Sequence, residues 1–120
     1  MSIDVALTDL AKAIGERGSL AYLVTVGEHG PRVVSVSVEV ADDVTLVMAA
    51  GRHTLTNAAA RPEVALLWPA GSTDPTHTLL VDGTAAPGRE DGELAVTPTK
   101  AILHRVRAGK GAPPSDAPRP

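Results

Sequence analysis

Aromatic residues are almost absent from this sequence, which holds one tyrosine, Tyr22, one tryptophan, Trp68, and no phenylalanine among 120 residues. The core must therefore be built from Val, Leu, Ile and Ala, which leave little bulk to fill a wide interior. A single sheet wrapped on itself, or completed by a second subunit, suits such small side chains better than a wide sandwich. The length is typical of one domain.

Cysteine is missing altogether, which excludes disulfides, Cys-ligated zinc, iron–sulfur clusters and thiol nucleophiles. The N-terminal segment carries Asp4 and Asp9 and lacks a basic stretch followed by an apolar run, so it does not resemble a secretory signal. No apolar run approaches the roughly 18 residues that cross a bilayer. We therefore expect a cytoplasmic protein that does not enter a membrane.

Basic residues are scarce over most of the chain. The first 99 residues hold six basic and thirteen acidic residues, whereas the segment from Lys100 onward holds five basic residues and one acid. An acidic body with almost no aromatic side chains offers neither phosphate neutralisation nor base stacking. We therefore expect no nucleic-acid partner.

The sequence lacks the spacing patterns of metal sites and of hydrolases. Its histidines, at positions 29, 53, 77 and 104, show no paired helical spacing, so no metal site is predicted. There is no G-x-S-x-G nucleophile elbow, and no general acid, base or nucleophile stands out. The catalytic residues therefore stay unassigned.

Two short helices are predicted. Near the N-terminus, apolar residues recur with a helical period and predict an amphipathic helix over 4–15, stopped by Gly15 and Gly18. A second short helix is expected over 54–61, ended by Pro62.

Most of the remaining sequence has strand character. In 33–40 the valines at 34, 36, 38 and 40 share one face, and Ser35, Ser37 and Glu39 share the other. Strands are predicted at 20–26, 33–40, 44–49, 63–68, 77–87 and 94–107, with a bulge or close approach at Gly83 and a break at Pro98. Short turns between them favour an antiparallel barrel over a parallel sheet. The Pro/Gly/Ala-rich tail 108–120 is expected to be disordered by itself, which leaves 1–107 as the folded domain.

The stretch VMAAGRHTLTN, residues 47–57, runs from an apolar strand into small residues, an arginine, hydroxyls and an amide. A helix N-terminus offers unpaired N–H groups, Gly51 lets a ligand approach the backbone, and Arg52 adds a fork of donors for phosphate oxygens. Thr54 is equally an ordinary N-cap, and Arg52 an ordinary surface residue. Ser35 and Ser37 likewise face either a ligand, solvent or a second subunit. The residues alone leave these alternatives open.

The segment TVGEHGPRVVSVSVEVADDVTLVMAAGRHTLTNAAARPEVALLW, residues 25–68, resembles the core of the pyridoxamine-5′-phosphate-oxidase-like flavin-binding split barrels. The resemblance lies in the order of a glycine-turn hairpin, a strand ending in small, hydroxyl and basic residues, a short helix containing an asparagine, and a strand that follows a proline. LLVDGTA, residues 79–85, fits the fifth strand of that family. The chain looks most like a small actinobacterial branch whose members use FMN or the deazaflavin F420.

The resemblance implies a mainly β, Greek-key-like antiparallel split barrel that forms a homodimer, with two cofactor clefts along the interface. It places Arg52, Thr54 and Asn57 near the cofactor phosphate. The residues that it places along the ring, the ribityl chain and the adjoining loop are Val34, Ser35, Val36, Met48, Ala49, Ala50 and Gly51.

Two features depart from the family. Many members carry a lysine three residues before the helix asparagine, where this sequence has Thr54, so that Arg52 is left as the only nearby formal positive charge. The C-terminal extension that true pyridoxamine-phosphate oxidases use for substrate is absent, so synthesis of pyridoxal phosphate is not expected.

The function implied is an oxidoreductase that depends on FMN or F420 and acts on a small-molecule substrate, with the cofactor carrying the hydride or electron chemistry. A binding or carrier module for FMN, F420 or haem, without turnover, is a second hypothesis. A cofactor-free dimeric scaffold is a third, and the missing lysine favours it.

Overall fold

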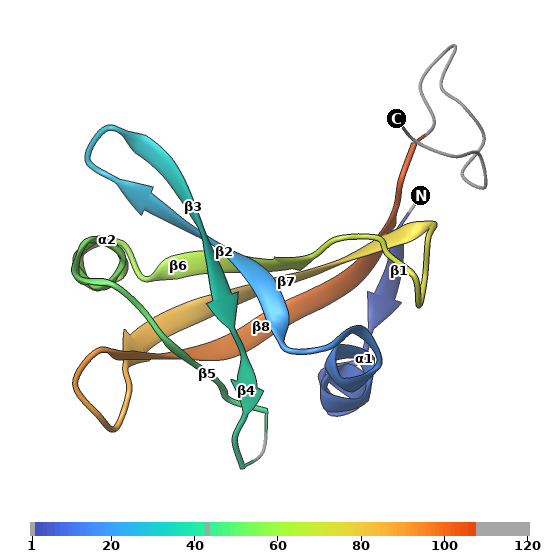
Figure 1. Cartoon of the computed structure of the whole chain (residues 1–120), viewed down its shortest axis with the longest axis horizontal. Coiled ribbons are helices and arrows are strands. Elements are labelled where there is room, and N and C mark those ends of the chain that lie inside the picture. The colour runs from blue at the N-terminus through green and yellow to red at the C-terminus, as the bar shows by residue number, and fades with distance from the viewer. Residues whose placement is uncertain (1, 43, 108–120) are drawn as a thin grey trace.

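A computed structural model describes residues 2–42 and 44–107. Eight strands, two α-helices and one short 3-10 helix follow one another along this part of the chain (Figure 1). In order they are β1 (Ser2–Val5), η1 (Leu7–Asp9), α1 (Leu10–Arg17), β2 (Leu20–Gly27), β3 (Gly30–Ser37), β4 (Glu39–Val40), β5 (Leu46–Ala49), α2 (Arg52–Ala60), β6 (Glu63–Trp68), β7 (His77–Pro87) and β8 (Glu93–Arg105).

The strands form one curled antiparallel sheet in the order β3-β2-β6-β7-β8-β5-β4, and β1 pairs with β8. The strands at the two ends of this order, β3 and β4, are consecutive in the chain and separated only by Val38. One segment therefore joins both edges of the sheet, which curls into a split barrel. The mainly β antiparallel fold predicted from the sequence is confirmed.

The core lies inside the curl and is made almost entirely of aliphatic side chains. Leu23, Leu46, Leu66, Leu79 and Val81 are fully buried there. Trp68 is also buried, and its Nε1–H donates to the carbonyl oxygen of Gly18 at 2.9 Å. The single tryptophan thus fills the core and ties the end of α1 to the sheet.

The valine alternation in 33–40 is present but divided between two strands. Val36 and Val38 are buried and Val40 is half-buried, as the pattern predicts. Val34 lies on the same face but is 36% exposed, because the β2–β3 hairpin extends past the core as a projecting arm (Figure 1). The far end of this hairpin therefore presents apolar side chains to the surface.

The predicted helix over 4–15 is wrong in its first half. Residues 2–5 form β1, which pairs with the stretch from Ala101 to His104, and the helix begins only at Leu10 and continues to Arg17. Pairing with an open edge of β8 satisfies the backbone groups of this segment and outweighs its helical periodicity. Gly18 ends the helix with a positive φ of 95°.

The helix predicted over 54–61 begins two residues earlier, at Arg52, and Gly51 is its N-cap in an extended conformation. Thr54 is therefore not the N-cap. It lies within the first turn and is only 7% exposed. Small residues before Arg52 allow the chain to turn directly from β5 into the helix.

Pro98 does not break the last strand, contrary to the prediction. β8 is continuous through it, because β5 pairs with 93–96 and β1 with 101–104, so Pro98 lies between these partners where no N–H is needed on that edge. The bulge predicted at Gly83 is confirmed by a register shift between Asp82 and Gly83. A Cβ there would lie 2.5 Å from Cγ1 of Val96, so the position requires glycine.

The predicted tail, 108–120, lies outside the described residues, and the domain boundary at 107 stays a prediction. Within 2–42 and 44–107, no helix is both long enough and apolar enough to cross a membrane.

Candidate functional site

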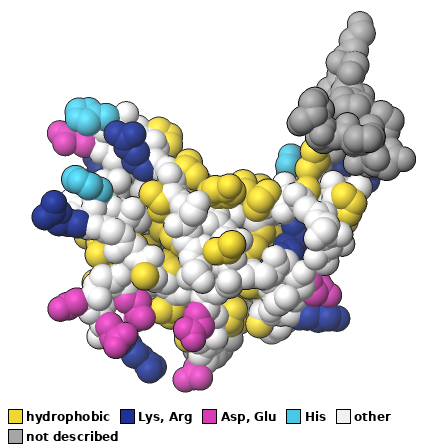
Figure 2. All heavy atoms as spheres, in the orientation of Figure 1, with side chains coloured by type: hydrophobic (Ala, Val, Ile, Leu, Met, Phe, Trp, Pro, Cys, Tyr) yellow, Lys and Arg dark blue, Asp and Glu magenta, His cyan; other side chains and the backbone are white. Residues whose placement is uncertain are grey.

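A surface pocket of about 440 Å³ lies between the β2–β3 hairpin and the first turns of α2. Figure 2 shows basic and histidine side chains gathered at this end of the molecule. The hairpin and the helix both contribute to the lining, which consists of Gly27, Glu28, His29, Arg32, Val33, Val34, His53, Thr54 and Asn57.

Helix α2 is held against β2 by a contact between Asn57 and Gly27. The Asn57 side-chain amide donates to the hydroxyl of the buried Thr25 at 3.5 Å. A Cβ on Gly27 would lie 3.2 Å from both Nδ2 and Oδ1 of Asn57, so glycine makes room for the amide. Asn57 thus fixes the spacing between the two walls of the pocket, in addition to facing it.

The first turn of α2 has no side-chain cap. The first backbone bond of the helix runs from the N–H of Leu55 to the carbonyl of Gly51 at 3.0 Å. The N–H groups of Arg52, His53 and Thr54 come before that bond and have no partner within the helix. Together with the helix dipole they favour an anion at this end.

The charge around the pocket differs from the sequence-based expectation. Arg52 is exposed and is not among the lining residues, whereas Arg32 lines the pocket together with His29 and His53. The expectation that Arg52 is the only nearby positive charge is therefore wrong. The sequence signal for Arg32 was its place two residues after Gly30 in the hairpin, but only the fold shows that this hairpin faces α2.

The structure brings together three of the residues placed near the cofactor by resemblance: Val34, Thr54 and Asn57. Ser35 is exposed on the outer face of β3, opposite Tyr22 in the register with β2. The side chains of Val36 and Met48 are buried in the core, so only their backbone is available to a ligand.

The remaining predicted site residues lie where β5 leads into α2. Ala49 and Gly51 are exposed, and Ala50 is half-buried with its N–H bonded to the carbonyl of Gly92 at 2.9 Å. Ala49 ends the strand, Ala50 and Gly51 connect it to the helix, and none of the three lines the pocket.

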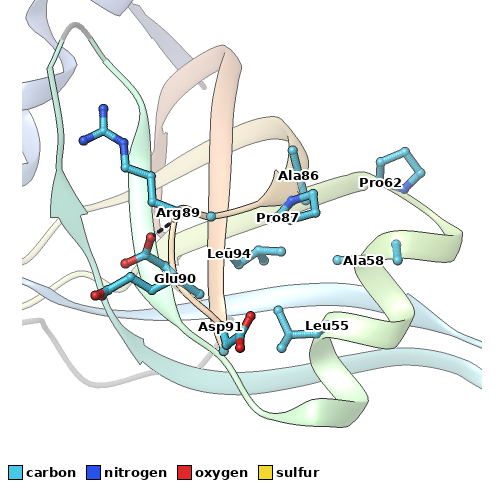
Figure 3. Close-up of a pocket in the computed structure, with 14 residues that line it drawn as sticks. Leu55, Ala58, Pro62, Ala86, Pro87, Arg89, Glu90, Asp91 and Leu94 are labelled. Atoms are coloured by element: carbon cyan, nitrogen blue, oxygen red, sulfur yellow. Dashed lines mark hydrogen bonds between the residues drawn. The ribbon is translucent and has the colours of Figure 1, made fainter.

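A second pocket, of about 450 Å³, lies on the other side of α2, against the β7–β8 hairpin (Figure 3). Sequence reasoning did not find it. Its apolar lining includes Leu55, Ala58, Pro62, Pro87 and Leu94. At its rim the backbone N–H of Arg89 donates to Oε1 of Glu93 at 2.9 Å, which holds the hairpin turn in place.

A cluster of charged side chains lies away from both pockets and joins α1 to the loop between β6 and β7. Arg17 donates to Oδ2 of Asp74 at 3.1 Å and to the carbonyl oxygen of His77 at 2.9 Å. The pKa of Asp74 is lowered to about 2, first because the backbone N–H of Thr76 donates to its carboxylate and further because the Thr76 hydroxyl and His77 stabilise the charge. Because these bonds all join parts of the fold, we interpret the cluster as structural.

No family model matches this sequence. Two relatives are uncharacterized proteins of Mycobacterium bovis and Mycobacterium tuberculosis. Each is 36% identical over 124 aligned positions, which cover 87% of this chain and 82% of the relative. The chain belongs to the same family as these mycobacterial proteins.

Solved structures identify the fold of this chain. A provisionally named pyridoxamine 5′-phosphate oxidase from Listeria innocua superposes with a TM-score of 0.65 at 17% identity, covering 82% of this chain and 98% of that one. An FAD binding protein from Mycobacterium smegmatis superposes with a TM-score of 0.58 at 20% identity, covering 89% of this chain and 100% of that one. An F420 reductase superposes with a TM-score of 0.54 at 17% identity, covering 80% of this chain and 93% of that one. The fold is that of the pyridoxamine-5′-phosphate-oxidase-like split barrels, as the resemblance implied.

Proposed function

We propose that this protein binds FMN or F420 and uses it as a cytoplasmic oxidoreductase acting on a small molecule. The observation that carries the proposal is the pocket between the β2–β3 hairpin and α2, in a fold shared with an FAD binding protein and an F420 reductase. The pocket combines an arginine with a helix turn that has no side-chain cap, which suits the phosphate of such a cofactor.

The residues divide into two groups in this proposal. Thr54, Asn57 and the first N–H groups of α2 hold the phosphate end. The ring lies along β3, where Val34 supplies an apolar contact, and near the end of β5, where Ala49 and Ala50 leave room. The bound cofactor supplies hydride or electron transfer, and the protein positions it and limits the access of water.

We further propose a homodimer that forms through the outer face of β2 and β3. Leu20, Tyr22, Val26 and Val33 are 74%, 43%, 41% and 59% exposed on this face. They lie on the same side of the sheet, because residues 20, 22 and 26 alternate along β2 and Val33 pairs with Val24. Val33 lies both on this face and in the pocket lining, so a second copy that covers the face would also reach the edge of the pocket.

Titration of the purified protein with FMN, F420 and haem tests the proposal. We expect quenching of flavin or deazaflavin fluorescence, with saturation at one cofactor per chain. A protein that binds FMN or F420 and is then reduced or reoxidised by a small-molecule partner is an enzyme, whereas one that binds without turnover is a carrier. A protein that binds none of the three contradicts the proposal and leaves the scaffold hypothesis.

A further inference from the structure

We propose that Arg32, on the β2–β3 hairpin, supplies the charge that makes the pocket selective for phosphorylated ligands. The inference rests on the proposed cofactor function, and it assigns phosphate recognition to a residue that sequence reasoning placed in a turn. The hairpin and α2 then act together as the two sides of one phosphate site.

The sheet register directs Arg32 toward α2. Arg32 is the cross-strand partner of Thr25 on β2, and directly opposed residues in an antiparallel pair project to the same face. Thr25 is buried, and its hydroxyl accepts a hydrogen bond from Asn57 of α2. The Arg32 side chain therefore projects from the face of the hairpin that α2 covers, which agrees with its place in the pocket lining.

The Arg32 guanidinium is also available to a ligand. Within residues 2–42 and 44–107 the ion pairs join Arg17 and His77 to Asp74, and Arg32 makes none. Glu28 is the single carboxylate in the lining. A planar guanidinium without a carboxylate partner offers two parallel N–H donors to a phosphate monoester.

Thr54 and Arg32 face the same pocket from opposite sides. Thr54 contributes a hydroxyl donor from the helix, and Arg32 contributes the formal charge from the hairpin. Arg52 lies outside the lining, so we expect it to contribute less than Arg32 to phosphate affinity.

A comparison of FMN with riboflavin, which lacks the phosphate, tests the assignment. Fluorescence titrations use the wild type, Arg32→Ala, Arg32→Lys and Arg89→Ala, the last being an exposed arginine on the β7–β8 hairpin. We expect Arg32→Ala to raise the Kd for FMN about tenfold to a hundredfold, as for other hydrogen bonds to charged groups, and to leave riboflavin unchanged. Arg32→Lys should restore part of the affinity, and Arg89→Ala should match the wild type.

Equal effects of Arg32→Ala on FMN and riboflavin, or no effect on FMN, would overturn the assignment while the proposed function stands. If the wild type binds neither flavin, the same variants are titrated with F420, which also carries phosphate, and with inorganic phosphate by calorimetry. Phosphate binding that Arg32→Ala abolishes then supports the anion site even though the flavin proposal has failed. If neither F420 nor inorganic phosphate binds, both the proposed function and the assignment of Arg32 are overturned.

Discussion

At the scale of single residues, Gly27 decides how closely α2 approaches the sheet. Asn57 packs over it and reaches the hydroxyl of Thr25, so the helix is positioned by an amide that needs the space a side chain would occupy. Both walls of the proposed cofactor pocket therefore depend on this contact.

Gly27→Ala should move Asn57 outward by a few tenths of an ångström and lower the free energy of unfolding by about 1 kcal/mol, the low end for overpacking. Gly15→Ala is the matched control, because a Cβ at Gly15 in α1 has no atom within 4 Å. That change should stabilise the protein by about 0.5–1 kcal/mol. Urea unfolding measures both changes in the free energy of unfolding. Equal changes in the two variants would contradict the packing role of Gly27.

We expect the stability of the protein to fall at acid pH because of Asp74. Its pKa falls from 3.8 to about 2 on folding, so its stabilising contribution is complete above pH 4 and is lost as the pH falls toward 2. In Asp74→Asn this contribution is removed at every pH. Urea midpoints measured from pH 5 to pH 2 should therefore converge for the two proteins at the acid end, and a constant difference between them would show that Asp74 is not responsible.

At the scale of elements, polar contacts at its C-terminal end attach α1 to the sheet. Arg17 bonds Asp74 and the carbonyl of His77, and Trp68 bonds Gly18 just beyond the helix. The helix buries only Leu10 and Ile14, so this polar attachment matters more for α1 than for a longer helix.

Arg17→Ala should destabilise the protein by about 1.5–3 kcal/mol, because it leaves Asp74 and a backbone carbonyl without their charged donor. Hydrogen exchange should show that amides of α1 lose protection before those of β6 and β7. Arg61→Ala, at an exposed arginine that ends α2, is the control and should change neither measurement. Uniform loss of protection across the sheet would argue against a local attachment.

Elements whose partners lie close in the sequence could be predicted well. β6 and β7 match their predicted bounds, because Pro62 and the loop at 69–75 delimit their apolar runs, and the bulge was predicted from Gly83. β1 was missed because its partner, Ala101–His104, lies nearly a hundred residues later and no local pattern reports such a pairing. In the candidate site, Thr54 and Asn57 were named from the family resemblance, whereas Arg32 depends on the hairpin register and could not be predicted from the sequence.

At the scale of the whole molecule, the proposed homodimer can be tested by substitutions on the outer face of β2 and β3. The wild type should sediment at twice the chain mass of 12.3 kDa. Tyr22→Glu should shift it to the monomer and weaken cofactor binding, because a charge on this apolar face opposes burial. Ile3→Glu, at an exposed apolar residue on β1, should remain dimeric. If the wild type sediments as a monomer, the homodimer proposal is wrong and no second copy contributes to the proposed cleft.

The pairing of β1 with β8 also has a consequence during synthesis on the ribosome. Residues 2–5 are translated nearly a hundred residues before Ala101–His104, the stretch of β8 that they join. At about 5–20 residues per second, this N-terminal segment waits on the order of 5–20 s with its backbone groups unpaired. During that interval β2, β3 and β6 can already associate with one another. The strand β1 therefore stays without its pairing partner until β8 has left the exit tunnel.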